Sequence, residues 1–163
     1  MRNIMARFLI VCTANICRSP LAEGILRMAL NARGVGAEHE VDSAGIQALV
    51  GQAPAPHSIA VAAAYGADIR AHVAREFCTD DFLRFDEIIA MDYGHLDFLQ
   101  SVRPPNDPGR IALLPTANGH GALEIGDPYG GPRPDYERAG RLIATGIATL
   151  LTRLLGAANP ARD

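Results

Sequence analysis

Hydrophobic residues along the chain gather in short runs that alternate with longer segments of helical spacing. Residues 8–11, 86–91 and 111–114 are short and largely apolar, as in strands buried on both faces of a sheet, and 40–43 predicts a fourth strand. Helical spacing is found at 20–34, 57–65 and 135–155, and a shorter helix is expected to begin at 79–81. Strands that alternate with helices predict an α/β fold with a mostly parallel sheet.

Turn-forming residues set the limits of these elements. Pro20 suits the first residue of a helix that Ser19 caps, and this helix is expected to end near Gly34 or Gly36. Residues 103–110 and 115–134 are loop-like, and the second segment is long enough to suggest a function. The tail, 157–163, is expected to fray. We therefore predict one domain over residues 1–163, a three-layer sandwich with helices on both faces of a four-stranded sheet.

Composition narrows the classes of protein open to such a fold. The 163 residues carry a formal charge of −3, which argues against nucleic acid or an anionic membrane as a partner. The apolar run after Arg2 and Arg7 is too short for a signal peptide or a membrane span, so we expect a cytoplasmic protein. Three cysteines suit a reducing compartment rather than a disulfide scaffold. Every basic residue is arginine, which excludes Schiff-base chemistry on lysine.

A polar segment follows the first predicted strand, at the edge of the sheet where α/β proteins bind ligands. If it curls, its backbone N–H groups and the helix N-terminus form a cradle for an anion. Arg18 can then hold a phosphoryl group by two parallel hydrogen bonds, and Cys12 at the floor is favoured as a thiolate. The alternative is a buried structural cysteine at a strand end. The expected phosphate-binding residues are Thr13, Ala14, Asn15, Ile16, Cys17, Arg18 and Ser19.

The sequence of residues 8–24, FLIVCTANICRSPLAEG, resembles the signature of the low-molecular-weight protein tyrosine phosphatases. Similarity continues in order at 42–45 (DSAG), 72–75 (HVAR), 90–92 (AMD) and 127–130 (DPYG). The resemblance implies a flavodoxin-like strand order 2-1-3-4 and an enzyme that hydrolyses phosphotyrosine through a phosphocysteine, without metal or cofactor. The partners it implies are a tyrosine-phosphorylated protein and a cognate tyrosine kinase, and we expect a monomer or weak dimer.

The resemblance also implies a role for each catalytic residue. Cys12 attacks phosphorus, Arg18 stabilises the transition state, and Asp127 protonates the leaving oxygen and later activates water. Without the resemblance, Asp127 reads equally well as the first residue of an Asp-Pro turn. Asp92 belongs to the same edge of the sheet, but the sequence gives it no specific role.

Supporting residues are implied as well. Asn15, Ser19, Ser43 and His72 would hold the phosphate loop in shape, and asparagine tolerates a left-handed backbone. Ordinary satisfied polar groups are the alternative for Ser43 and His72. Cys17 would be a redox partner that protects Cys12 by a disulfide, or else a spectator thiol. We interpret Cys78 as structural, and Glu23 with Arg75 as no more than a solvated ion pair or cap.

The substrate pocket departs from the family pattern in three ways. Ala14 replaces the usual glycine, which is acceptable if its φ is negative. Gly130 replaces a second aromatic residue, and no tryptophan occurs at 47–50, which leaves Leu49 and Tyr129 as the expected walls. Ile16 replaces a threonine of the related phosphoarginine phosphatases and cannot bind a guanidinium, so an aryl phosphate is favoured.

Three alternative functions remain open at this stage. The first is a phosphoarginine phosphatase, and the second is a thioredoxin-coupled arsenate reductase on the same scaffold. Arsenate reduction needs further cysteines, and only Cys78 lies beyond the loop. The third is a catalytically silent phosphoprotein-binding module, which the presence of Cys12, Arg18 and Asp127 disfavours.

Overall fold

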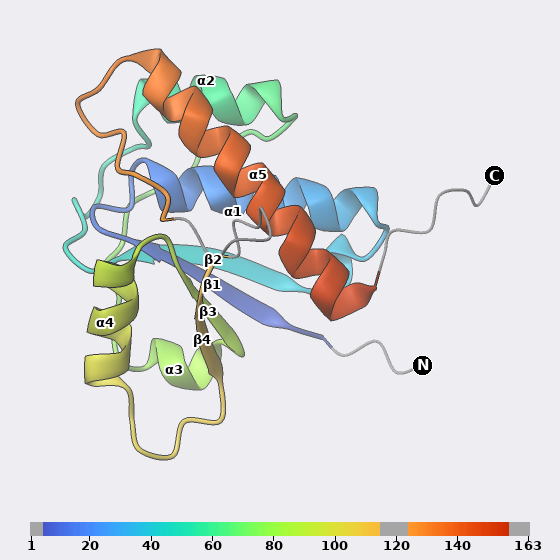
Figure 1. Cartoon of the computed structure of the whole chain (residues 1–163), viewed down its shortest axis with the longest axis vertical. Coiled ribbons are helices and arrows are strands. Elements are labelled where there is room, and N and C mark those ends of the chain that lie inside the picture. Colours follow the sequence, from blue (N-terminus) through green and yellow to red (C-terminus); the bar gives the residue numbers. More distant parts are fainter. Residues whose placement is uncertain (1–4, 115–123, 157–163) are drawn as a thin grey trace.

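A four-stranded parallel sheet forms the centre of the structure (Figure 1), a computed structural model that describes residues 5–114 and 124–156. The strands are β1 (Arg7–Cys12), β2 (Glu40–Gly45), β3 (Glu87–Ala90) and β4 (Arg110–Leu113). Their order in the sheet is β2-β1-β3-β4, and all neighbours run parallel. The predicted order 2-1-3-4 is thus confirmed.

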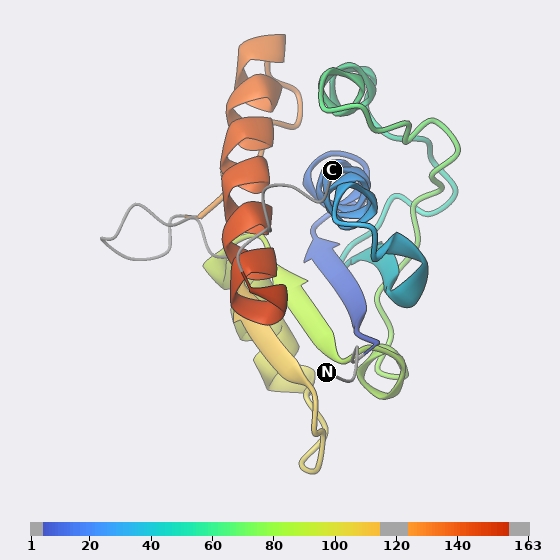
Figure 2. The same cartoon turned by 90° about the vertical axis from the view of Figure 1, so that its right-hand side faces the viewer.

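Helices cover both faces of this sheet (Figures 1 and 2). On one side lie α1 (Arg18–Ala32), α2 (Pro56–Ala64) and α5 (Arg133–Leu155). On the other lie α3 (Asp81–Arg84) and α4 (Tyr93–Val102), and a 3-10 turn (Gly36–Glu38) precedes β2. The three-layer sandwich is confirmed. Within residues 5–114 and 124–156, no helix has the length and apolar character needed to cross a membrane.

Two buried clusters explain why β1 is apolar along its whole length. Phe8 and Ile10 belong to the cluster formed with α1, α2 and α5, whereas Leu9 and Val11 belong to the one formed with α3 and α4. Alternate side chains of a strand point to opposite faces of the sheet. A strand covered on both faces must therefore be apolar at every position, which is the pattern that predicted it.

The start of α1 differs from the prediction. The helix begins at Arg18 instead of Pro20, and the residue before it is Cys17, whose side chain makes no capping hydrogen bond. Ser19 does not cap the helix, because it lies inside the first turn and its hydroxyl contacts Cys12 and Asn15. The helix thus begins within the segment expected to bind phosphate.

The helix α4 has no counterpart among the predicted elements. It begins where Asp92 Oδ1 accepts a hydrogen bond of 2.9 Å from the backbone N–H of His95. Its first turn contains Tyr93, Gly94 and His95, which are poor helix formers. Helix propensity therefore does not predict this helix. Part of the predicted loop, 115–123, and the tail expected to fray, 157–163, lie outside the described residues.

The carboxyl ends of the strands share one edge of the sheet, and Gly45 brings two of them into close contact. Cys12 pairs with Gly45, and Val11 pairs with Ala90. A Cβ added to Gly45 would lie 2.4 Å from the carbonyl oxygen of Thr13. Only glycine therefore lets the end of β2 approach the loop that follows β1.

We expect Gly45→Ala to lower the free energy of unfolding by about 1–3 kcal/mol, because backbone atoms cannot move away from the new methyl group as a side chain could. Gly126→Ala is the matched control, since a Cβ there meets no described atom within 4 Å. Urea unfolding of both variants measures the difference. Equal stability of the two variants would contradict the close approach.

Candidate active site

The loop between β1 and α1 contains one residue in the left-handed region. Asn15 has a φ of 58°, and it is the one residue other than glycine with positive φ in the described part of the chain. Ala14 therefore does not need the freedom of the glycine that it replaces. Within the described residues, the backbone N–H groups of residues 13–17 donate to no protein acceptor. They remain available to a ligand.

A hydroxyl group lies against the sulfur at the end of β1. Cys12 is buried, and its Sγ is 2.9 Å from Ser19 Oγ. The same oxygen accepts a hydrogen bond of 2.8 Å from Asn15 Nδ2. Because the amide donates to the oxygen, the hydroxyl hydrogen is left to point at the sulfur, where it stabilises a thiolate.

The side chain of Asn15 ties the loop to two other segments. Its Oδ1 accepts from the backbone N–H of Arg75 at 2.9 Å, and its Nδ2 donates to Ser43 Oγ at 2.9 Å. Ser43 in turn donates to Glu23 Oε2 at 3.3 Å. The carbonyl oxygen of Asn15 lies 3.0 Å from His72 Nε2. The structure thus brings together all four residues expected to support the loop.

His72 lies between two acceptors, which makes its imidazole a double donor. Nδ1 is 3.3 Å from Glu23 Oε2, and both side chains are 9% exposed. Burial disfavours the charged ring, but the hydrogen bonds to Glu23 and to the Asn15 carbonyl, with the negative charge of Glu23, raise the pKa of His72. The described geometry fits an imidazolium.

The interpretation of Glu23 and Arg75 as a solvated ion pair or cap is wrong. Glu23 is buried and contacts Ser43 and His72. Its carboxylate provides the acceptor that the polar groups supporting the loop need in the protein interior. Arg75 pairs with Asp42 at 3.0 Å and with the buried Asp81 at 3.1 Å. These ion pairs fix the backbone that holds Asn15.

Arg18 is buried, with an exposed fraction of 2%, and hydrogen bonds hold its guanidinium in place. Its Nη1 donates to Asp92 Oδ2 and to the carbonyl oxygen of Ile125, both at 2.9 Å. Nη2 lies 3.5 Å from Asp127 Oδ2. In the described residues, Nε and Nη2 have no hydrogen-bond acceptor, so one edge of the guanidinium stays free for an oxyanion. Asp92, which had no assigned role, orients this arginine.

A small pocket unites the expected catalytic residues with both expected walls. Its volume is about 240 Å³. The half-exposed Asp127 and the exposed Tyr129 are among the residues that line it. The Ile16 side chain is instead buried in the core. Gln47, to which the sequence assigned no role, is also part of the wall. The lining residues are Cys12, Thr13, Ala14, Cys17, Arg18, Gln47, Leu49, Asp127 and Tyr129.

The three cysteines are all free thiols. Cys17 is buried with its Sγ 3.6 Å from Tyr136 Oη, and burial raises the pKa of this thiol. Cys78 is exposed and does not line the pocket. In the described residues no group of three or more histidine, cysteine or acidic side chains could hold a metal ion.

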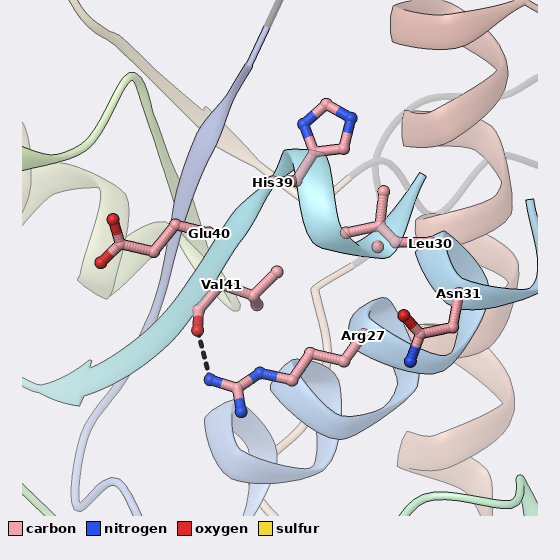
Figure 3. Close-up of a pocket in the computed structure, with 7 residues that line it drawn as sticks. Arg27, Leu30, Asn31, His39, Glu40 and Val41 are labelled. Carbon is pink, nitrogen blue, oxygen red and sulfur yellow. Dashed lines mark hydrogen bonds between the residues drawn. The ribbon is translucent and has the colours of Figure 1, made fainter. Parts of the chain in front are cut away.

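A second cavity, of about 360 Å³, lies at the opposite end of the sheet, beside the first residues of β2 (Figure 3). Three of its polar side chains are already paired. Arg27 donates to the Val41 carbonyl oxygen, Glu40 pairs with Arg84, and His39 Nδ1 accepts from the Ala6 N–H. The thiol–arginine pocket is the better candidate for chemistry, and it defines an α/β protein with a Cys-x5-Arg phosphate loop.

The chain is similar to known proteins over most of its length. The family model "Low molecular weight phosphotyrosine protein phosphatase" matches residues 7–158. A low molecular weight protein-tyrosine-phosphatase of Streptomyces coelicolor is 36% identical over 89% of this chain and 91% of its own length. A protein tyrosine phosphatase from Entamoeba histolytica, solved with Hepes in its active site, has a TM-score of 0.85 at 26% identity, covering 91% of this chain and 96% of that chain. For Vibrio vulnificus Wzb in complex with benzylphosphonate, the TM-score is 0.79 at 27% identity, covering 92% and 99%. The chain belongs to the low molecular weight phosphotyrosine protein phosphatase family.

Two substitutions of Asn15 separate the contribution of its backbone conformation to stability from that of its side-chain hydrogen bonds. Asn15→Gly keeps the left-handed φ and loses the side-chain hydrogen bonds, whereas Asn15→Ala loses both. We expect the alanine variant to unfold more easily than the glycine variant by about 1–2 kcal/mol, measured in urea. Equal stability of the two variants would show that the loop does not need the left-handed conformation.

The raised pKa of His72 makes stability depend on pH. The contribution of the imidazolium is fully present below the ordinary value of 6.5 and is lost as the pH rises through the raised value. We expect the free energy of unfolding of the protein to fall relative to that of His72→Gln as the pH rises above 6.5. Parallel pH profiles of the two proteins would exclude a charged His72.

Proposed function

We propose that this protein hydrolyses phosphotyrosine in proteins, with Cys12 as the nucleophile. The observation that carries the proposal is the position of a buried thiol, with a hydroxyl 2.9 Å away, in a pocket shared with Arg18 and Asp127. The unpaired N–H groups of the loop and the free edge of Arg18 suit the three equatorial oxygens of a phosphoryl group.

In the first step, the Cys12 thiolate attacks phosphorus. A bond forms between sulfur and phosphorus, and the bond from phosphorus to the phenolic oxygen breaks. The proton of the Asp127 carboxylic acid passes to that oxygen, so tyrosine leaves as a neutral phenol. Arg18 stabilises the charge on the equatorial oxygens, and the loop N–H groups assist it.

In the second step, water replaces the sulfur. The Asp127 carboxylate takes a proton from water while the water oxygen bonds to phosphorus. The bond between sulfur and phosphorus breaks, inorganic phosphate leaves, and the Ser19 hydroxyl stabilises the thiolate that returns. The protein thus regains its starting state, with Asp127 protonated again.

An aryl phosphate is the substrate that suits the pocket walls. Leu49 and Tyr129 form its apolar part, and a tyrosine ring can pack between them. The benzylphosphonate bound by the similar Wzb structure carries a phosphonate and a phenyl ring. Such a ligand has the two parts that this pocket would recognise.

The partner we propose is a tyrosine-phosphorylated protein, together with the tyrosine kinase that opposes this reaction. We further propose a monomer or weak dimer in the cytoplasm, as one domain. The chemistry supports this compartment, because a thiolate nucleophile with a second free thiol, Cys17, beside it must be kept reduced.

We expect the protein to hydrolyse p-nitrophenyl phosphate and phosphotyrosine peptides without added metal. Cys12→Ser should abolish turnover, because a serine hydroxyl is a far weaker nucleophile at neutral pH. Asp127→Ala should lower kcat by about 10²–10⁴ because the leaving oxygen then lacks its acid. Cys78→Ser is the control, with full activity expected, since Cys78 lies outside the pocket.

Full activity of Cys12→Ser would refute the mechanism. A parallel assay on phosphotyrosine, phosphoarginine and phosphoserine peptides tests the substrate. Preference for phosphotyrosine supports the proposal, whereas preference for phosphoarginine would show that the same site acts on a different substrate. Tight binding of phosphopeptide by the unchanged protein without turnover would make it a binding module.

A further inference from the structure

A buried histidine touches the phosphate loop from the side of α4. His95 is 2% exposed, and its Nε2 lies 2.8 Å from Thr13 Oγ1. Thr13 is the residue directly after Cys12 and lines the pocket. The proposed mechanism does not use His95, and the sequence offered no sign of it because α4 itself escaped prediction.

The other ring nitrogen of His95 faces the residue that orients Arg18. Nδ1 lies 3.1 Å from Asp92 Oδ1, yet among the described residues it has no hydrogen-bond partner of acceptable geometry. Asp92 Oδ1 already accepts the backbone N–H of His95, and Oδ2 accepts from Arg18. A proton on Nδ1 is attracted by the carboxylate, whereas a lone pair there would be repelled. This favours the tautomer with hydrogen on Nδ1.

With its hydrogen on Nδ1, the neutral ring can only accept at Nε2. The Thr13 hydroxyl then donates its hydrogen to His95. We propose that His95 is a positioning residue of the phosphate loop: its neutral imidazole binds the Thr13 hydroxyl and couples the first residue of the loop to the Asp92–Arg18 pair. The inference rests on the proposed phosphatase function and concerns the same site.

The charged groups around His95 oppose one another. Burial and the positive charge of Arg18 disfavour a second proton, whereas the carboxylates of Asp92, Asp127 and Glu124 favour it, and the pKa of His95 is lowered on balance. The ring is therefore neutral at neutral pH. In acid, Nε2 would become a donor, the Thr13 hydroxyl would have to turn, and the imidazolium would compete with Arg18 for Asp92.

A matched pair of variants at Thr13 tests the contact. Thr13→Val keeps the shape of the side chain and removes the hydroxyl, while Thr13→Ser keeps the hydroxyl. With p-nitrophenyl phosphate at neutral pH, we expect Thr13→Val to lower kcat about threefold to tenfold with little change in KM, and Thr13→Ser, which keeps the donor, to lose clearly less kcat than Thr13→Val. The loss in Thr13→Val should shrink as acid protonates His95, which a purely structural role would not predict.

His95→Leu completes a double-mutant cycle with Thr13→Val. If the two residues act through one hydrogen bond, the double variant loses no more kcat than the more damaging single variant. Nitrogen NMR of the labelled protein should show Nε2 of His95 without a proton, with His95→Leu used to assign the signal. Should His95→Leu fail to fold, the kcat values of the two Thr13 variants and their dependence on pH still decide.

Three results would overturn the inference: unchanged kcat in Thr13→Val, multiplicative losses in the cycle, or a proton on Nε2 at neutral pH. A wild-type protein that does not hydrolyse p-nitrophenyl phosphate refutes the proposed function instead. In that case, the wild-type protein, Thr13→Val, His95→Leu and the double variant are titrated with inorganic phosphate in a calorimeter. The four binding constants measure the coupling between Thr13 and His95. Weaker and non-additive phosphate binding would then support the role of His95, and independent effects would refute it.

Discussion

A loop that reserves its N–H groups for an anion cannot use them to hold itself together, and this constraint shapes the site. Residues 13–17 donate no backbone hydrogen bond to a described protein acceptor, so their conformation has to be fixed from behind. The side chain of Asn15 does this with three hydrogen bonds, and its left-handed backbone turns the loop. The charged pair of His72 and Glu23 then anchors the Asn15 carbonyl and the Ser43 hydroxyl.

The arginine depends on the sheet in a similar way. A buried guanidinium is unfavourable unless it is paired, and Nη1 of Arg18 donates hydrogen bonds to Asp92 after β3 and to the carbonyl of Ile125. The other edge of the guanidinium makes only a longer ion pair, of 3.5 Å, with Asp127. Cys12 ends β1, and Gly45 at the end of β2 allows the close approach to the loop. The strands β1, β2 and β3 therefore each deliver part of the site at or just after their carboxyl ends, which explains why their parallel order matters for the chemistry.

Local and long-range information differ in what a single sequence reveals. The strand pattern at 8–11, the helix patterns and the motif around Cys12 and Arg18 predicted the α/β fold and the loop, because both are encoded in consecutive residues. The strand order 2-1-3-4 depends on long-range pairing and was implied only by the resemblance to the family. Asp92 and His95 could not be assigned in this way, since their partners Arg18 and Thr13 lie 74 and 82 positions away along the chain. Glu23 was misjudged for the same reason: its spacing resembles that of an exposed helical residue, while its partners come from other segments.

The mild negative charge of the chain does not conflict with an anionic substrate, because the binding groups are concentrated in one loop. Asp127 Oδ2 lies 3.5 Å from Arg18 Nη2, so a negative charge already faces this edge of the guanidinium. A lysine in place of Arg18 could not offer one edge to Asp92 and another to the ligand, which gives a physical reason for arginine at this position.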